Sequence, residues 1–316
     1  MKSTFKQLSP IWLLKILVRL RALAKGKWPL GLAQKSLAKK ANSQNLSGKI
    51  LRKMAFDRDP MLTIFADKYL VRDYVEKRVG SKYLNKLIAA GDSVEVLRST
   101  TLPSNFALKS NHGSGGMILV WEKAPSQNNL PKGRPKNAWS QFLVQPGHFD
   151  LDNAERLAKN WLSNNYHFRP GQFPEWAYKN IKPMLLIEEL MFDDQGELPS
   201  DFKFFMANGE CIFIQVDTSR FDGHKRDLYT KSWEKIPGAY HFPQSGSTMR
   251  RPKHLDEMIS VATDLAAGVD FVRVDIYETN NGIKFGELTN YPGGGIEKFV
   301  PESLDEALGT TWVQNY

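Results

Sequence analysis

The sequence predicts a mixed α+β fold in which short, largely antiparallel strands alternate with amphipathic helices. Three observations support this prediction: two pairs of β-rich runs are joined by tight-turn signals, apolar residues recur at helical spacing between them, and the composition is that of a globular protein. The 316 residues are 41% hydrophobic and 24% charged. A chain of this length is typical of two domains or subdomains. The single cysteine, Cys211, excludes an internal disulfide framework.

The first 53 residues carry 13 Lys or Arg and no Asp or Glu, so the net charge of +9 arises there. The apolar run in this segment is interrupted by Lys15, Arg19 and Arg21, which make it too short and too charged to span a bilayer. The pattern predicts a basic amphipathic helix on an anionic membrane surface. A helix packed on the core with its lysines solvated is the alternative interpretation. No aromatic pattern or motif indicates nucleic-acid binding.

The first half of the chain predicts a helical region followed by two strands, a long loop and a helix. Helical apolar spacing predicts the helices, and β-rich runs around a polar glycine-rich turn predict the strands. A concentration of Pro, Gly, Asn and Lys predicts the loop. In that order, the ranges are 54–100, 106–110, 117–121, 122–150 and 152–166.

The second half predicts a buried strand, a hairpin around an Asn-Gly turn, a second long polar loop and an amphipathic helix. Loops of this length in compact domains are often functional. In chain order, the ranges are 184–190, 201–217, 218–250 and 254–269.

The stretch from residue 270 to residue 295 is the most informative part of the chain. Arg273 and Asp275 are two residues apart on a predicted strand, so both point to one face. An Asn-Asn-Gly turn then leads into a second strand that ends near Glu287 and is followed by a Pro-Gly-Gly-Gly break. The hairpin can bring Asp275 and Glu287 side by side. Two carboxylates beside an arginine suit Mg²⁺ that bridges nucleotide phosphates.

Three further motifs are candidates for phosphate and nucleotide contacts. The turn KSNHGSGG, at residues 109–116, can fold backbone N–H groups over phosphates, although a plain hairpin loop explains it too. Glu188 and Glu189 end a strand, where they can meet an adenosine or be solvated acids. Asp201 and Lys203 share one strand face, where they can hold a ribose hydroxyl and a phosphate respectively or form a simple ion pair.

The order of these motifs resembles the ATP-grasp superfamily from residue 68 to about residue 295. The likeness is greater to the teichuronopeptide-biosynthesis (TupA-like) ATP-grasp family, and the segments that carry it are DKYLVRDYV, LKSNHGSGG, DFKFFMANGE and VDIY…FGELT.YPGGG. The resemblance implies an ATP-grasp fold, in which two α+β subdomains grip ATP, with a basic helical N-terminal extension. The implied divisions are 1–53 for the extension, 54–190 for an N-terminal region and the ATP-lid subdomain with the Gly-rich loop, and 191–316 for the core subdomain with the metal site.

The resemblance implies a nucleotide site drawn from both halves of the chain. Lys68 and Lys109 would contact the ATP phosphates and the adenine edge. The mobile loop over the β- and γ-phosphates would consist of Gly113, Ser114, Gly115 and Gly116. The adenine pocket and the ribose contact would be formed by Glu188, Glu189, Met191 and Asp201.

The implied metal site departs from a common family pattern. Asp275 and Glu287 would hold Mg²⁺. Many ATP-grasp ligases have Glu-x-Asn at this point, but here Asn290 is shifted by one residue, which moves it to the other strand face. Either Thr289 takes its place or the site uses fewer protein ligands.

The implied catalytic groups are Arg273, which would stabilise the transferring phosphoryl group, and Lys203 near the phosphates. Only 67 residues precede Lys68, so the acceptor site would be built differently from that of many such ligases, by the 218–250 loop. The candidate acceptor residues are Arg220, His224, Arg226 and Trp233.

The function implied is that of an ATP-dependent carboxylate–amine ligase with an acyl-phosphate intermediate. Its substrates would be a uronic acid of a surface polysaccharide or its precursor and an amino acid. The protein would be cytoplasmic and peripheral on the inner membrane face. The alternatives are a kinase on the same scaffold, a non-catalytic membrane-associated binding module, or a glycosyltransferase. Two Asp-x-Asp triplets, at 57–59 and 150–152, favour the last of these.

Overall fold

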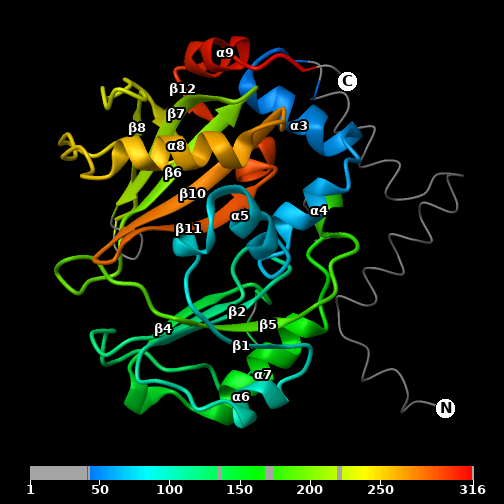
Figure 1. The fold of residues 1–316 in the computed structure, drawn as a ribbon, viewed down its shortest axis with the longest axis vertical. Coiled ribbons are helices and arrows are strands. Elements are labelled where there is room, and N and C mark those ends of the chain that lie inside the picture. The colour runs from blue at the N-terminus through cyan, green and yellow to red at the C-terminus, as the bar shows by residue number, and fades with distance from the viewer. Residues whose placement is uncertain are drawn as a thin grey trace, which may run out of the picture.

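The computed structural model of the chain describes residues 41, 43–133, 135, 137–167, 174–218 and 223–314. The described part forms two α+β subdomains, each built on a five-stranded sheet, and one lies above the other in Figure 1. This architecture confirms the predicted mixed α+β fold. Residues 1–40, which hold most of the predicted basic extension, lie outside the described residues.

The lower subdomain in Figure 1 is built on the sheet β1-β5-β2-β3-β4. All of its strand pairs are antiparallel except the parallel pair β3–β4. Helices α6 and α7 pack on this sheet and bury a core that includes Trp161. The element bounds are β1 Leu87–Gly91, α6 Glu95–Ser99, β2 Phe106–Ser110, β3 Met117–Val120, β4 Gln141–Val144, η3 Pro146–His148, α7 Leu151–Leu162, η4 Trp176–Tyr178 and β5 Leu185–Glu189.

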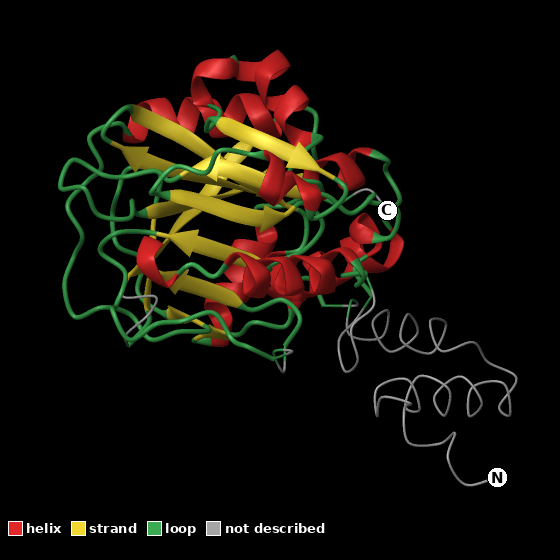
Figure 2. Cartoon of the chain, turned by 90° about the horizontal axis from the view of Figure 1, so that it is seen from below, coloured by secondary structure: helices red, strands yellow, loops and turns green. Residues whose placement is uncertain are grey.

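The upper subdomain is built on the antiparallel sheet β11-β10-β6-β7-β8, which we call the second sheet. Figure 2 shows the strands as a central layer with helices packed around it. The strand bounds are β6 Asp201–Ala207, β7 Glu210–Thr218, β8 Lys225–Tyr229, β9 Ala239–Tyr240, β10 Phe271–Thr279, β11 Gly282–Thr289 and β12 Phe299–Val300. The helix bounds are α3 Leu46–Phe56, α4 Met61–Ala66, α5 Val71–Val79, η2 Ser81–Tyr83, α8 Leu255–Ala266, η5 Pro292–Gly295 and α9 Glu302–Thr310.

The two faces of the second sheet differ because side chains alternate along each strand. On β10, Val272, Val274 and Ile276 belong to the core that α5 and α8 cover. Arg273 and Asp275 lie between them in sequence and therefore point to the opposite face. An aromatic core that α3 and α9 help to cover occupies one end of that face, and polar side chains occupy the rest.

Four of the strands that the sequence analysis missed lie where it predicted helix or loop, and the fifth, β12, lies beyond the last predicted element. Strand β1 lies inside the region predicted as helical, β4 lies inside the first predicted loop, and β8 and β9 lie inside the second. Ala89 and Ala90 in β1 have low strand propensity, and the strand is stabilised by its pairing with β5. These pairings depend on contacts distant in sequence, which local patterns do not show.

The predicted boundary at residue 53 falls inside α3, so this helix is part of the folded core and not of the extension. Lys49 and Lys53 are buried. Lys49 donates to the carbonyl of Gly309 at 2.8 Å, and Lys53 pairs with Asp57 at 2.7 Å. Helices α4 and α5 pack against the second sheet and its helix α8, so residues 54–83, which the prediction grouped with the lid as its N-terminal region, lie with the upper subdomain.

Candidate active site

Four side chains from four adjacent strands line up across the polar face of the second sheet. Glu287 on β11 is the register partner of Asp275 on β10, which pairs with Lys203 on β6. Lys203 in turn pairs with Gln215 on β7. Because neighbouring strands lie about 4.8 Å apart, this row is about 15 Å long. The hairpin predicted from the sequence is present, and it places the two candidate metal carboxylates side by side.

Two cations balance the charge of the buried Asp275 carboxylate, which is 2% exposed. Arg273 donates from Nε and Nη2 to its two oxygens at 2.6 Å each, and Lys203 Nζ lies 2.7 Å from Oδ2. Burial raises the pKa of Asp275, and the charges of Arg273 and Lys203 oppose that rise. Arg273 also reaches Glu287 at 3.0 Å, and Lys203 forms a second ion pair with Asp201.

Lys68 connects the glycine-rich turn to the carboxylate row. It lies in the turn between α4 and α5, and its backbone N–H donates to Asn111 O at 3.0 Å. Its side chain donates to Gly113 O at 2.7 Å and lies 3.8 Å from Glu287 Oε2. Burial lowers the pKa of Lys68, while the charge of Glu287 raises it. One lysine therefore contacts both subdomains where their polar faces meet.

The turn that was predicted to cover phosphates packs closely against Trp139. A Cβ built on Gly113 would lie 2.6 Å from the Trp139 ring, and one on Gly115 would lie 2.0 Å from its carbonyl oxygen. Gly115 and Gly116 also have positive φ values of 92° and 55°, which favour glycine. These contacts explain why the turn is rich in glycine, apart from any ligand. Ser114, at the tip, is exposed.

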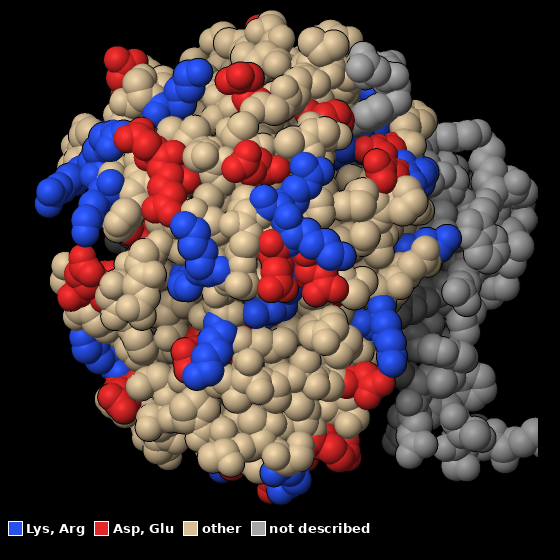
Figure 3. All heavy atoms as spheres, viewed as in Figure 1, with Lys and Arg blue, Asp and Glu red and all other residues tan. Residues whose placement is uncertain are grey.

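Glu188 at the end of β5 is held by two cations. Lys109 Nζ lies 2.8 Å from Oε2, and Arg72 Nη1 lies 3.1 Å from Oε1. Burial opposes ionisation of Glu188, but Lys109 and Arg72 hold the pKa of its carboxyl below the usual value. The sequence analysis missed Arg72, which lies on α5. Figure 3 shows side chains of both charges intermingled across the middle of this face of the molecule.

The remaining nucleotide candidates lie at or after the end of β5. Glu189 is exposed and pairs with Lys86 at 2.5 Å. Met191 follows in the half-buried connection to β6. Asp201 and Lys203, at the start of β6, are both buried. The structure thus places these predicted residues at the end of β5, at the start of β6 and on the connection between them.

Thr289 and Asn290 point in different directions, as the predicted strand alternation requires. The Thr289 hydroxyl donates to Glu287 Oε1 at 3.2 Å. Asn290 is buried and donates from Nδ2 to Leu62 O on α4 at 2.7 Å. Thr289 therefore lies with the carboxylate row, and Asn290 ties the end of β11 to a helix.

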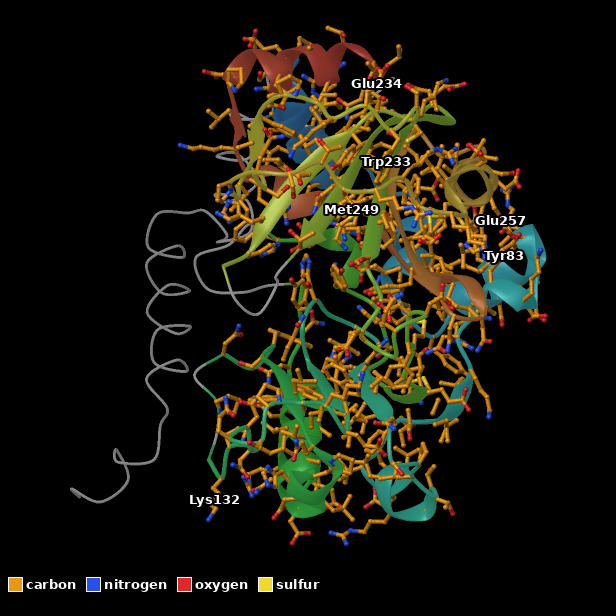
Figure 4. The ribbon with its side chains drawn as sticks, turned by 90° about the vertical axis from the view of Figure 1, so that its left-hand side faces the viewer. Tyr83, Lys132, Trp233, Glu234, Met249 and Glu257 are labelled. Atoms are coloured by element: carbon orange, nitrogen blue, oxygen red, sulfur yellow. The ribbon has the colours of Figure 1, made fainter. Side chains whose placement is uncertain are left out.

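Three of the four predicted acceptor residues are described, and each of them has structural contacts. Trp233 is buried in the core, stacks on Tyr229 with ring centroids 4.3 Å apart, and donates from Nε1 to Met249 O at 3.0 Å (Figure 4). The Arg226 guanidinium is buried between two carboxylates. Arg220 lies outside the described residues. Of the three described residues, only His224 is a partly exposed polar side chain, at 22%, and it lies 3.1 Å from Asp217 Oδ1.

The Asp-x-Asp triplets form helix caps and ion pairs. Asp59 accepts from the first turn of α4, and Asp150 caps α7. Asp57 and Asp152 pair with neighbouring basic side chains. These roles explain the triplets without a metal–diphosphate site.

Burial raises the pKa of the Cys211 thiol to about 12, which argues against a nucleophile there.

The donor set of the row suits Mg²⁺ held mainly by substrate phosphates. Mg²⁺ is commonly bound by one or two carboxylates together with phosphates and waters. Asp275 and Glu287 provide two such carboxylates, and Lys203, Lys68 and Arg273 provide positive charge for phosphates. Within the described ranges, no group of three or more His, Cys, Asp or Glu side chains is arranged to hold a metal by itself.

None of the described helices is long and apolar enough to cross a membrane.

Several solved structures are similar to this chain. The ATP-grasp ligase PsnB complexed with a minimal precursor aligns with a TM-score of 0.38 and 12% identity, over 83% of this chain and 67% of that one. D-alanine–D-alanine ligase from Bacillus anthracis complexed with ATP has a TM-score of 0.38 and 12% identity over 74% of this chain and 56% of that one. N5-carboxyaminoimidazole synthetase from Staphylococcus aureus has a TM-score of 0.38 and 9% identity over 72% of this chain and 45% of that one.

The chain thus spans between 45% and 67% of the length of these three proteins. A search of curated proteins found no match. The model of the TupA-like ATP-grasp family, in contrast, matches residues 45–313, which include all the described helices and strands. This protein therefore belongs to the TupA-like ATP-grasp family.

Proposed function

We propose that this protein is an ATP-dependent ligase that joins a carboxylate to an amine. ATP is its nucleotide and Mg²⁺ the accompanying ion, as expected for a member of the ATP-grasp family. One observation carries the proposal: the carboxylates of Asp275 and Glu287 and the cations of Lys203 and Arg273 form one contiguous group on a sheet face. Such a group suits a divalent ion and a transferring phosphoryl group together.

In the first step, a carboxylate oxygen of the substrate attacks the γ-phosphorus of ATP, and ADP leaves with the bonding electrons. The bound metal would neutralise phosphate charge while held by Asp275 and Glu287. Arg273 and Lys203 would stabilise the charge on the transferring group, and Lys68 would hold the glycine-rich turn near the phosphates. In the second step, an amine attacks the acyl carbon and phosphate leaves, which produces an amide.

The nucleotide base would be recognised where β5 ends. Glu188, fixed by Lys109 and Arg72, and the connection through Met191 are the groups available there. Asp201 would contact the ribose. These assignments are supported by the placement of the residues at the end of β5, at the start of β6 and on the connection between these strands.

The substrates and setting form the finer part of the proposal. We propose a uronic acid of a surface polysaccharide or its precursor as the acid and an amino acid as the amine. The protein would be cytoplasmic and peripheral on the inner membrane face, with the basic N-terminal segment on anionic lipid. Membership of the TupA-like family and the charge of the first 53 residues support this setting.

The test is ADP release from MgATP in the presence of hydroxylamine, with glucuronic and galacturonic acids and a mixture of L-amino acids. Hydroxylamine converts an acyl phosphate into a hydroxamate. We expect ADP and hydroxamate from the full-length protein and a loss of both, by at least about 100-fold, in Asp275→Asn. Asp264→Asn, at an exposed position on α8, is the control. ADP with a stable phosphorylated product and no hydroxamate would identify a kinase instead.

A further inference from the structure

A second group of charged side chains lies near the row, and the mechanism above does not use it. It joins strands β7, β8 and β9 to the segment that follows the Pro-Gly-Gly-Gly turn. We call it the Glu297 cluster, and its members are Asp217, His224, Arg226, Tyr240 and Glu297. Asp217 is two residues from Gln215 on β7, so the cluster continues on the same sheet face.

Arg226 is fully engaged within the cluster. Its Nε donates to Asp217 at 2.7 Å and its Nη1 donates to Glu297 Oε2 at 3.0 Å. Its guanidinium carbon lies 5.1 Å from the ring centroid of Tyr240 and 4.9 Å from that of Phe242. Among the described members of the cluster, two carboxylates share one guanidinium, so the carboxylates outnumber the arginine. The cluster therefore suits a cationic group better than the carboxylate that the sequence predicted for this loop.

The glycine turn makes room for Glu297. Gly293 and Gly294 have nearly the same left-handed conformation, with φ values of 57° and 59°. A Cβ on Gly293 would lie 2.5 Å from Glu297 Cγ, whereas one on Gly294 would have nothing within 4 Å. Only Gly293 therefore lets the Glu297 side chain fold back towards Arg226. The turn that marks the family motif thus also positions a carboxylate eight residues after Thr289.

The Glu297 cluster lies next to the phosphoryl-transfer groups. Burial raises the pKa of Tyr240, as does the charge of Glu297, while the charges of Arg226 and Arg273 lower it. The geometry agrees, because Asp217 lies two residues along β7 from Gln215, which is the register partner of Lys203. An ionised carboxylate has about four acceptor positions. The Glu297 side chain is 22% exposed, so it can accept further hydrogen bonds from a substrate.

We propose that Glu297 binds the ammonium group of the amine substrate and accepts its proton before amide formation. This proposal rests on the ligase function proposed above. The ammonium group transfers one proton to the Glu297 carboxylate, and the freed nitrogen lone pair forms the C–N bond. The bond between the acyl carbon and the phosphate oxygen breaks, and phosphate leaves with the electron pair and the second proton. Arg226 acts as a positioning residue because it holds the carboxylate, and Tyr240 packs against the Arg226 guanidinium.

The experiment compares two nucleophiles on the full-length Glu297→Gln variant. Amino acids arrive as ammonium ions, but hydroxylamine is largely uncharged at neutral pH and needs no base. With uronic acids and MgATP, we expect amide formation from the L-amino-acid mixture to fall by about 100-fold or more. Hydroxamate formation should stay within about threefold of the unmodified protein, since phosphorylation of the acid does not use Glu297.

The matched pair Gly293→Ala and Gly294→Ala tests the positioning without removing the carboxylate. Both variants place alanine at a left-handed φ, so both carry a similar backbone cost. We expect only Gly293→Ala to lose amide formation while it keeps hydroxamate formation. Unchanged amide formation in Glu297→Gln, or an equal loss of both products, would overturn the assignment. A lack of hydroxamate from the unmodified protein would refute carboxylate activation itself and the assignment with it.

Discussion

Arg273 donates hydrogen bonds to both carboxylate oxygens of Asp275, each at 2.6 Å. The arrangement neutralises a buried acid, because an unpaired charge at this depth would be costly. We expect these ion pairs to change when MgATP binds. A divalent ion would replace the side-chain cations as the partner of Asp275 and Glu287. The phosphate oxygens would then pair with Arg273 and Lys203. The charges would then remain paired before and after MgATP binds.

Replacement of Arg273 by lysine tests this exchange. Lysine keeps the positive charge but lacks the planar fork that contacts two oxygens at once. We expect Arg273→Lys to fold and to reduce ADP release at saturating MgATP by about 100-fold, the order of effect seen when one transition-state contact is removed. ADP release close to that of the unmodified protein would show that charge alone is sufficient.

Thr289 and Asn290 should have separable effects. Thr289→Val removes the hydrogen bond to Glu287, and loss of a partner of a metal ligand weakens metal binding by about 10- to 100-fold. Asn290→Ala leaves the Leu62 carbonyl without its donor and should lower the free energy of unfolding by about 1–3 kcal/mol. A Mg²⁺ titration of ADP release and a urea unfolding curve measure the two effects. If Asn290→Ala but not Thr289→Val changed the Mg²⁺ concentration needed for ADP release, Asn290 and not Thr289 would be the residue that supports the metal site.

Lys68 should matter for nucleotide affinity. Its ammonium group contacts Gly113 O and lies near Glu287 on β11. Lys68→Met would therefore remove the side-chain contacts that link the glycine-rich turn to β11. We expect the MgATP concentration for half-maximal ADP release to rise by about 10- to 100-fold, because a charged hydrogen bond contributes about 1.5–3 kcal/mol. Lys77→Met, at an exposed position on α5, is the matched control and should leave this concentration unchanged.

Gly115 should be intolerant of a side chain. An alanine there would have a positive φ and a Cβ 2.0 Å from the Trp139 carbonyl oxygen, so we expect Gly115→Ala to cost about 2–4 kcal/mol of stability. Gly209→Ala is the matched control, because φ is 86° there and nothing lies within 4 Å of the added Cβ. Urea unfolding of both variants separates the clash from the backbone cost. Equal losses of unfolding free energy in the two variants would show that the structure around Trp139 shifts to accommodate the added Cβ without further cost.

Glu287 should contribute to acid sensitivity. Burial opposes its ionisation, but Lys68, Arg273 and Lys203 hold its pKa at about 2, below the ordinary value of 4.5. An acid with a lowered folded-state pKa stabilises the fold above the unfolded-state pKa, and this contribution disappears as the pH falls from about 4.5 to about 2. We therefore expect Glu287→Gln to lose less unfolding free energy than the unmodified protein between pH 5 and pH 3. Parallel losses in the two proteins would contradict this linkage.

Local sequence patterns predicted the part of the site that lies on one hairpin. Alternation places Arg273 and Asp275 on one strand face, and the turn signal sets the register that pairs Asp275 with Glu287. The same logic separated Thr289 from Asn290. These relationships span at most 17 residues, so period and turn type are sufficient to derive them.

Contacts between distant segments were not accessible in this way. Arg72 reaches Glu188 across 116 residues, and Arg226 reaches Glu297 across 71. No local sequence pattern predicts either ion pair. A charged residue on a helix or in a loop is ordinarily predicted to be exposed to solvent. The basic residues of α3 were likewise predicted to belong to a surface extension, but Lys49 and Lys53 are buried against backbone carbonyls and carboxylates.

The sequence by itself determined the fold class, the family likeness and the hairpin that carries Asp275 and Glu287, because these follow from side-chain alternation, turn chemistry and motif order. Only the tertiary structure decided which charges neutralise one another. It brought Lys68 between Gly113 and Glu287, enclosed Arg226 between two carboxylates and left Glu297 partly exposed. Such pairings depend on how distant elements pack against one another. The separation of those elements along the sequence does not indicate which of them will be close in space.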